Sequence, residues 1–333
     1  MVVRSPLSRI FCFLSPLLLF ALVTFIFTSS DKKGRYRSEK PLVLSTIAPL
    51  EALVHALAWD CVHSVCLIQG DLDPHTYQLR KGDGDLFSLA RLVVYNGLGL
   101  EHGASLFQSL DGSPHAFSVG SLLSNLDESF VIRSGGLPDP HIWLDLRLLY
   151  QVVPELANRL AEICPEKKGL IFQRSSQLVI RLREADDLVR QMVQEVPSSK
   201  RYLVSAHSAF SYFVRSYLAS EAERQDGSWI ERYISPEGLA PEAQVSFSHF
   251  KKVFEFVLQH DVRVVFPEVN VPSLALTKLV SMSMGSGHAL RLSQQALYSD
   301  SFPRPVEEDH LGKYIEVMVH NARAFRDAIL EEE

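Results

Sequence analysis

The stretch PLVLSTIAPLEALVHALAWDCVHSVCLI, residues 41–68, determines the fold class of this 333-residue chain. It predicts a strand at 41–46, a helix at 49–58 and a second strand at 62–68. A short helix at 85–90 and a third strand at 92–95 continue the pattern. Strands that alternate with helices indicate βαβ units and a mostly parallel sheet. The irregular segment 113–138 is expected to be an extended loop with a strand near 116–119.

The same alternation returns later in the chain. It predicts strands at 202–205, 262–266 and 289–292, and helices at 209–219, 273–284 and 310–331. Helices at 146–163 and 166–196 lie between the two alternating segments, and at ~1.5 Å per residue the second would reach about 46 Å. We therefore expect an α/β fold with two lobes, residues 31–163 and 198–333. Each lobe has a mostly parallel sheet flanked by helices, and one long rigid helix within 164–197 joins them.

The first thirty residues differ from the rest of the chain. Arg4 and Arg9 precede an uncharged apolar run at 10–28. A basic start followed by such a run is typical of an export signal, and its length also approaches the ~20 residues that span a bilayer. Residues 1–30 are thus expected to be a cleaved signal peptide or a retained anchor. In both cases the remaining chain works outside the cytoplasm.

Composition and cysteine usage narrow the function further. The chain has 33 Lys and Arg against 39 Asp and Glu, a formal net charge of −6, and this acidic balance argues against nucleic-acid binding. Beyond the leader only Cys61, Cys66 and Cys164 remain, too few for a disulfide framework. Cys61 and Cys66 could pair in an oxidising compartment, but Cys66 is expected inside a strand, where buried free cysteines are common.

Three of the twelve histidines share a sequence context. His75, His141 and His207 each follow a strand end or a loop and precede a helix, on the side where ligands bind in open α/β sheets. Each alone could be a polar loop residue that caps a helix. Together they favour a metal site, because imidazole is a common metal ligand. A carboxylate from the second lobe would be the fourth ligand, with Asp300 as the candidate and Glu268 in reserve.

Residues 65–101 resemble the metal-binding solute-binding proteins of ABC importers, the zinc, manganese and iron class. The matching positions are Gly70, Asp73-Pro74-His75, Tyr77, Asp85, Asn96-Gly97 and Glu101. The resemblance extends over residues 41–330. It continues through DPHIW (139–143), SAHSAF (205–210), ISPEG (234–238) and VVFPE (264–268).

The resemblance implies one divalent metal ion held between the lobes by His75, His141, His207 and Asp300. Three imidazoles and one carboxylate suit tetrahedral Zn²⁺, and imidazole also accepts iron and manganese. Two departures bear on the metal. Zinc-dedicated members often have a His/Asp/Glu-rich loop between the first two ligands, whereas residues 110–137 contain a single histidine, His115. Manganese-dedicated members often have Glu in place of His207. We expect zinc first, then iron or manganese.

The resemblance further implies a periplasmic, non-enzymatic carrier that delivers the metal to the membrane permease of an ABC importer, with its ATPase behind it. We expect a monomer without nucleic-acid partners. A zinc hydrolase is the first alternative, although H-E-x-x-H and G-x-S-x-G do not occur, and Asp300 as fourth ligand would occupy the position that a catalytic water needs. A surface adhesin with incidental metal binding is the second alternative.

Overall fold

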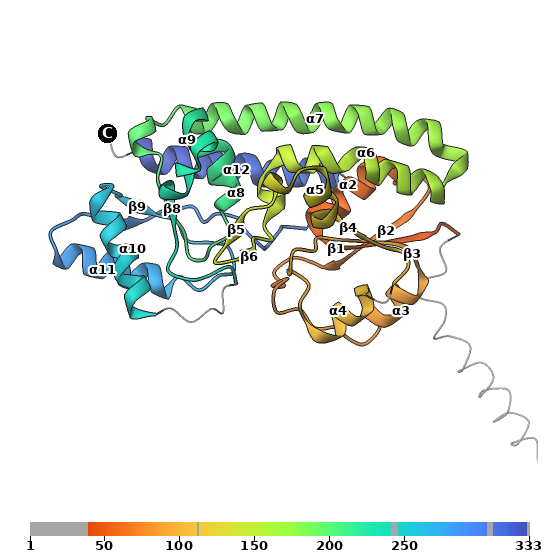
Figure 1. Ribbon diagram of the computed structural model, residues 1–333, viewed down its shortest axis with the longest axis horizontal. Coiled ribbons are helices and arrows are strands. Elements are labelled where there is room, and N and C mark those ends of the chain that lie inside the picture. Colours follow the sequence, from red (N-terminus) through yellow and green to blue (C-terminus); the bar gives the residue numbers. More distant parts are fainter. Residues whose placement is uncertain (1–38, 112, 241–245, 305–308, 332–333) are drawn as a thin grey trace, which may run out of the picture. The chain divides into compact units, whose positions relative to one another are not determined.

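The computed structural model describes residues 39–111, 113–240, 246–304 and 309–331 (Figure 1). Lys40–Glu333 group into one unit of mutually contacting residues. The expected signal or anchor lies outside the described residues. Within the described ranges, no helix is both long and apolar enough to cross a membrane. We call residues 40–163 the N-terminal half and residues 198–331 the C-terminal half; the predicted lobe boundaries remain a prediction.

A four-stranded parallel sheet organises the N-terminal half. Its order is β2-β1-β3-β4, with strands β1 (Leu42–Ile47), β2 (His63–Ile68), β3 (Ala90–Tyr95) and β4 (Ala116–Ser118). All six residues of β1 are buried, as expected for a central strand covered on both faces. The predicted parallel sheet is confirmed.

Helices cover both faces of this sheet. In Figure 1, α3 (Asp83–Leu89) and α4 (Ala104–Asp111) lie on one side. On the other side lie α2 (Ala48–Ala58), α6 (Leu146–Ile163) and, beyond it, α7 (Lys168–Gln194). Helix α2 has Pro49 in its first turn, where the missing N–H of proline costs no hydrogen bond.

The segment 113–138 is more ordered than predicted. Strand β4 is present, but helix α5 (Val119–Leu126) and a short hairpin, β5 (Arg133–Ser134) with β6 (Leu137–Pro138), replace the expected extended loop. Ser118 caps α5 by accepting the N–H of Ser121. Val119 and Leu123, four residues apart, bury one face of this helix. The helix is too short for its periodicity to stand out beside the surrounding Gly and Pro.

The long connecting helix is confirmed. A 3₁₀ turn at Pro165–Lys167 leads into α7, whose 27 residues extend about 40 Å. Near its start, Arg174 donates to the carbonyl of Leu57 in the N-terminal half at 3.2 Å. Near its end, Arg190 donates to the carbonyl of Ser216 in the C-terminal half at 2.6 Å. Helix α7 is therefore anchored to both halves.

The C-terminal half has shorter parallel strands. Strand β7 (Leu203–Val204) pairs with β8 (Tyr233–Ile234), and β9 (Val264–Val265) pairs with β10 (Arg291–Leu292). A parallel bridge between Ser205 and Phe266 joins the two pairs. The main helices are α9 (Glu221–Asp226), α10 (Phe247–Gln259), α11 (Leu274–Gly285) and α12 (His310–Leu330). The predicted helix at 209–219 is a single turn, α8 (Ser211–Phe213), that continues as a π-helical turn at Val214–Leu218.

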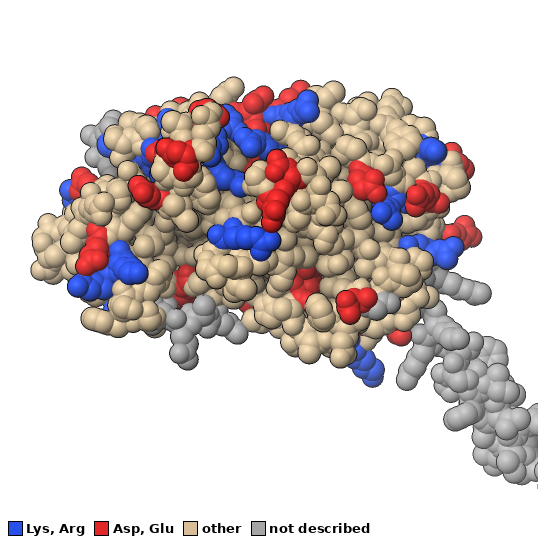
Figure 2. Space-filling model, viewed as in Figure 1, with Lys and Arg blue, Asp and Glu red and all other residues tan. Residues whose placement is uncertain are grey.

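The main hydrophobic core extends from the N-terminal sheet through α6 and α7 to α12. A smaller cluster that includes Val253, Val265 and Leu279 packs α10 and α11 on the C-terminal strands. Figure 2 shows acidic and basic side chains interspersed over the visible face.

Candidate metal centre

Four side chains from four separate segments meet inside the molecule. His75, His141, His207 and Asp300 each place one possible ligand atom within 4.8 Å of the others. The three histidines are almost fully buried, and the Asp300 side chain is 7% exposed. His75 and His141 come from the N-terminal half, and His207 and Asp300 from the C-terminal half. The structure thus brings together all four residues that the sequence analysis selected.

Strand topology explains why these residues converge. His75 follows β2, and His207 follows β7. Asp300 follows Leu297, whose backbone bridges Glu268 just beyond β9. The carboxyl ends of parallel strands lie at one edge of a sheet, where ligand sites of open α/β folds form.

The His75 loop is stabilised by Asp73. One oxygen of Asp73 accepts the N–H of His75 at 2.8 Å, and the other accepts the hydroxyl of Thr76 at 3.1 Å. Pro74 restricts the backbone between them. The side chain of His75 is therefore presented by a preorganised turn.

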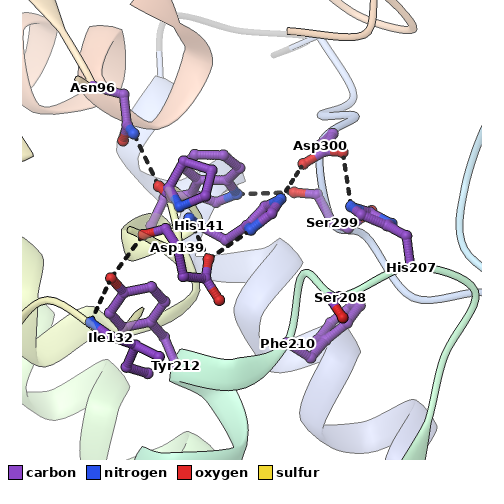
Figure 3. Close-up of polar contacts among 12 residues, drawn as sticks. Asn96, Ile132, Asp139, His141, His207, Ser208, Phe210, Tyr212, Ser299 and Asp300 are labelled. Atoms are coloured by element: carbon purple, nitrogen blue, oxygen red, sulfur yellow. Dashed lines mark hydrogen bonds and ion pairs between the residues drawn. The ribbon is translucent and has the colours of Figure 1, made fainter. Parts of the chain in front are cut away.

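His141 is oriented by Asp139, two residues earlier (Figure 3). Oδ1 of Asp139 accepts the backbone N–H of His141 at 3.0 Å and lies 2.7 Å from its Nδ1. Tyr212 donates to the carbonyl of Asp139, and Asn96 donates to the carbonyl of Pro140, both at 2.8 Å. Contacts from both halves thus fix the turn that presents this imidazole.

His207 is oriented by Glu268 in the same manner. Oε1 of Glu268 accepts the backbone N–H of His207 at 2.9 Å, and Oε2 lies 2.7 Å from Nδ1 of the ring. The hydroxyl of Tyr233 donates to the carbonyl of His207 at 2.6 Å. The sequence makes Glu268 the reserve candidate for the fourth ligand. In the structure Glu268 contacts Nδ1 of His207, whereas Nε2 of that ring faces Asp300.

Asp300 lies among the three imidazoles. Oδ2 is 3.1 Å from Nε2 of His207, and Oδ1 is 3.5 Å from Nε2 of His141. Oδ2 is also 3.7 Å from Nε2 of His75. The indole N–H of Trp143 donates to the carbonyl of Ser299 at 2.8 Å and fixes the backbone beside Asp300 (Figure 3).

Ring nitrogens of His75 and His141 face the same point as the Asp300 carboxylate. Because Nδ1 of His141 faces a carboxylate, its proton belongs there, and Nε2 presents a lone pair. That Nε2 lies 3.2 Å from Nε2 of His75. Burial lowers the pKa of His75 to about 3, so its ring is neutral at physiological pH. Two imidazole nitrogens and a carboxylate therefore converge on one point, an arrangement of donor atoms that a cation can occupy.

The pKa values of Asp300 and His207 are shifted in opposite directions. Burial disfavours the charged forms of both Asp300 and His207, but their mutual attraction overcomes it. The pKa of the Asp300 carboxyl lies below its usual range, chiefly because of His207. The pKa of His207 is raised well above its usual value by Glu268 and Asp300. Both oxygens of Asp300 are buried, and they make ion-pair contacts with the imidazole nitrogens of the site.

One further buried carboxylate supports the site from a distance. Glu101 was selected only as part of the family motif. It accepts the hydroxyl of Thr46 at 2.7 Å and the N–H groups of Asn96 and Gly97 at 2.8 and 2.9 Å. These bonds fix the loop from which Asn96 reaches the Asp139–His141 turn. Asp139 has no assigned role from the sequence. Asp73 occupies the same place before His75 and contacts its backbone, whereas Asp139 also contacts the ring of His141, so only the structure distinguishes the two.

Residues 43–328 match the model of a protein family described as "ZnuA: Zinc-uptake complex component A periplasmic". The chain belongs to this family. It is a family of substrate-binding transport proteins, not of enzymes.

Named relatives and solved structures agree with this assignment. The chain is 37% identical over 301 residues to "Metal-binding protein YtgA" of Chlamydia trachomatis, covering 90% of each chain. It is 28% identical over 212 residues to "Metal ABC transporter substrate-binding lipoprotein SsaB" of Streptococcus sanguinis, covering 62% of this chain and 69% of that one.

The crystal structure of Fe(III)-bound YtgA from Chlamydia trachomatis superposes with a TM-score of 0.81, covering 86% of this chain and 97% of that one at 37% identity. The periplasmic zinc-binding protein TroA from Treponema pallidum gives 0.76, with 87% and 99% covered at 26% identity. The predicted family and fold class are thereby confirmed.

Proposed function

We propose that this protein is the extracytoplasmic substrate-binding component of an ABC importer for a transition metal. It would bind one ion through His75, His141, His207 and Asp300 and release it to a membrane permease. The observation that carries this proposal is the buried convergence of four metal-type donors, two from each half. Membership of the family and the names of the relatives support it.

A carrier explains the site better than a hydrolase does. Catalytic zinc sites keep an open position for water beside three protein ligands. Here the fourth donor, Asp300, lies within 3.7 Å of all three imidazole Nε2 atoms, so the protein itself can complete a tetrahedral shell. Because the donors come from both halves, bound metal would hold the halves together, and separating them would release it.

We favour Zn²⁺ as the ion, because three imidazoles and one carboxylate match its tetrahedral preference. Iron is the second candidate. The site contains three buried carboxylates, Asp139, Glu268 and Asp300, a negative charge that suits a trivalent ion as well as a divalent one. The structure of a 37% identical relative contains Fe(III). Manganese is less favoured, since it prefers oxygen donors.

Elemental analysis and competition titration test this proposal. The purified protein would be stripped with a chelator and titrated with Zn²⁺, Mn²⁺, Fe²⁺ and Fe³⁺ under conditions that keep each soluble. We expect one equivalent of metal, and loss of the site in His75→Ala but not in His63→Ala, a histidine at the start of β2. A protein that binds no ion stoichiometrically, or a His75→Ala variant that binds like the wild type, would refute the assignment.

A further inference from the structure

Two buried cysteines lie together at the far end of the N-terminal sheet. Cys61 is in the turn between α2 and β2, before the strand whose other end leads to His75, and Cys164 caps the end of α6. They are 7% and 1% exposed. Sγ of Cys164 lies 3.5 Å from the carbonyl oxygen of Cys61. Each thiol also influences the pKa of the other.

Neighbouring contacts hold these two segments in register. Asp60, adjacent to Cys61, pairs with Arg174 at 2.5 Å and with Lys167 at 3.6 Å. Lys167 follows Cys164 by three residues, and its N–H donates to the carbonyl of Cys164 at 2.9 Å. The closeness of the thiols is thus supported by ion pairs that do not involve sulfur.

Cys66, the partner that the sequence suggested for Cys61, is engaged elsewhere. It lies within β2, and its thiol donates to the carbonyl of Ile68 at 3.2 Å. Strand β2 pairs with β1 along its length, with Cys66 opposite Ser45. Cys66 therefore serves as an internal control for the chemistry of the other pair.

We propose that Cys61 and Cys164 form a disulfide in the exported protein, a modification that rests on the extracytoplasmic location proposed above. The oxidant is a protein or small-molecule disulfide. One thiolate attacks it and displaces one of its sulfurs as a thiol, and the second cysteine then attacks the mixed disulfide. Two protons and two electrons leave the cysteine pair, and the oxidant is reduced to two thiols.

Burial determines when the bond would form. Desolvation raises the pKa of Cys164 to about 12 and also raises that of Cys61. Because the thiolate is the reactive species, the folded pair reacts slowly. The bridge would therefore form while the chain folds, and once formed it would be protected from reductants by the core around it.

The bridge would close a long loop. The two cysteines are 103 residues apart in sequence, and a cross-link over such a distance restricts the unfolded chain more than a short one does. It would tie the α2–β2 turn to the segment that starts α7. The bridge would lie before β2, whereas the metal ligand His75 follows the other end of that strand. We therefore expect the bridge to affect stability and not metal affinity.

Differential alkylation of the full-length protein tests the proposal. The chain is exported into the periplasm of an expression host, denatured in acid, and its thiols are labelled before and after reduction. We expect Cys66 to take the first label, Cys61 and Cys164 the second, and a Cys61–Cys164 linked peptide to appear without reduction. First-label modification of Cys61 and Cys164, or a Cys61–Cys66 link, would overturn the proposal.

Further measurements separate this proposal from the proposed function. Reduced protein refolded with oxidised glutathione should form the same link, and failure to do so would refute the pairing whatever the compartment. Cys61→Ala, Cys164→Ala and the double variant should each lower Tm by about 5–10 °C, with no further loss in the double. Reduction in the unfolded state, followed by refolding with reductant present, should lower Tm of the wild type and of Cys66→Ala only. Separate, additive losses would contradict a bridge, and metal titration of Cys61→Ala checks that binding persists.

Discussion

Glu268 holds His207 at two points, accepting its backbone N–H at 2.9 Å and approaching Nδ1 of its ring at 2.7 Å. Asp139 makes the same pair of contacts with His141, at 3.0 and 2.7 Å. Each half of the molecule thus contributes one histidine whose backbone and imidazole are oriented by a single carboxylate. Such partners direct the opposite nitrogen, Nε2, toward the ligand.

Replacing Glu268 should therefore weaken metal binding without removing a ligand. In Glu268→Gln the amide oxygen can still accept the N–H of His207, but the negative charge beside Nδ1 is lost. We expect the dissociation constant to rise about 10- to 100-fold, measured by competition with a metal chelator. Glu255→Gln, an exposed residue of α10 paired with Lys251, is the control. Equal affinities of Glu268→Gln and wild type would show that Glu268 does not tune this imidazole.

His207→Ala should reduce metal affinity by about tenfold or more, because it removes a ligand and leaves Glu268 and Asp300 unpaired. Circular dichroism should show an unchanged fold. His115→Ala, in an exposed loop, should bind like the wild type. A calorimetric titration in which His207→Ala retains full affinity would remove this residue from the ligand set.

Metal binding should release a proton from His207. Its pKa is raised in the metal-free protein, so the ring is charged near neutral pH, whereas a metal ligand must be neutral. Affinity should then fall about tenfold per pH unit below that raised pKa. His75, with a pKa of about 3, adds no proton competition at neutral pH. Calorimetry in buffers of different ionisation enthalpy should detect about one proton released by the wild type and none by His207→Ala.

The same shift predicts how stability depends on pH. Because the folded-state pKa of His207 exceeds the unfolded value of about 6.5, its ion pairs stabilise the metal-free protein fully below that pH. This contribution is lost as pH rises through the folded-state pKa. Denaturant titrations should show the loss on the alkaline side for the wild type and not for His207→Ala. An opposite slope would mean that His207 is neutral in the metal-free state.

Asn270 should control how fast metal leaves. Its side-chain amide donates to Asp71 of the N-terminal half and to Ser301, beside Asp300, both at 2.7 Å. Asn270 has a φ of 64°, which glycine adopts without strain. Asn270→Gly should therefore remove the two bonds alone and raise the dissociation rate about 5- to 30-fold, followed by stopped flow with a chelator. The control Asn125→Ala, exposed on α5, should release metal at the wild-type rate. A wild-type rate in Asn270→Gly would show that the hydrogen bonds of Asn270 do not retain the metal.

Much of the fold could be predicted because it depends on local periodicity. The βαβ units, the long helix α7 and the closing helix α12 each carry a continuous apolar pattern over a full element. Elements of one or two turns are set by contacts instead. Helix α5 depends on the Ser118 cap and two buried side chains, and the helix expected at 209–219 changes to a π turn at Val214.

By itself, the sequence determined the parallel α/β architecture and singled out three histidines, because strand ends and the loops that follow them are encoded locally. It left the fourth ligand open between Asp300 and Glu268, and the family resemblance implied Asp300. Only the tertiary structure decided what lies behind those residues. Glu268 follows β9, and the backbone bridge between Ser205 and Phe266 brings this segment beside the one that carries His207. The two residues are 61 positions apart in sequence, so their contact depends on strand pairing and not on local sequence. Cys61 likewise meets Cys164 and not nearby Cys66, since strand pairing directs Cys66 away while packing of α6 brings Cys164 close.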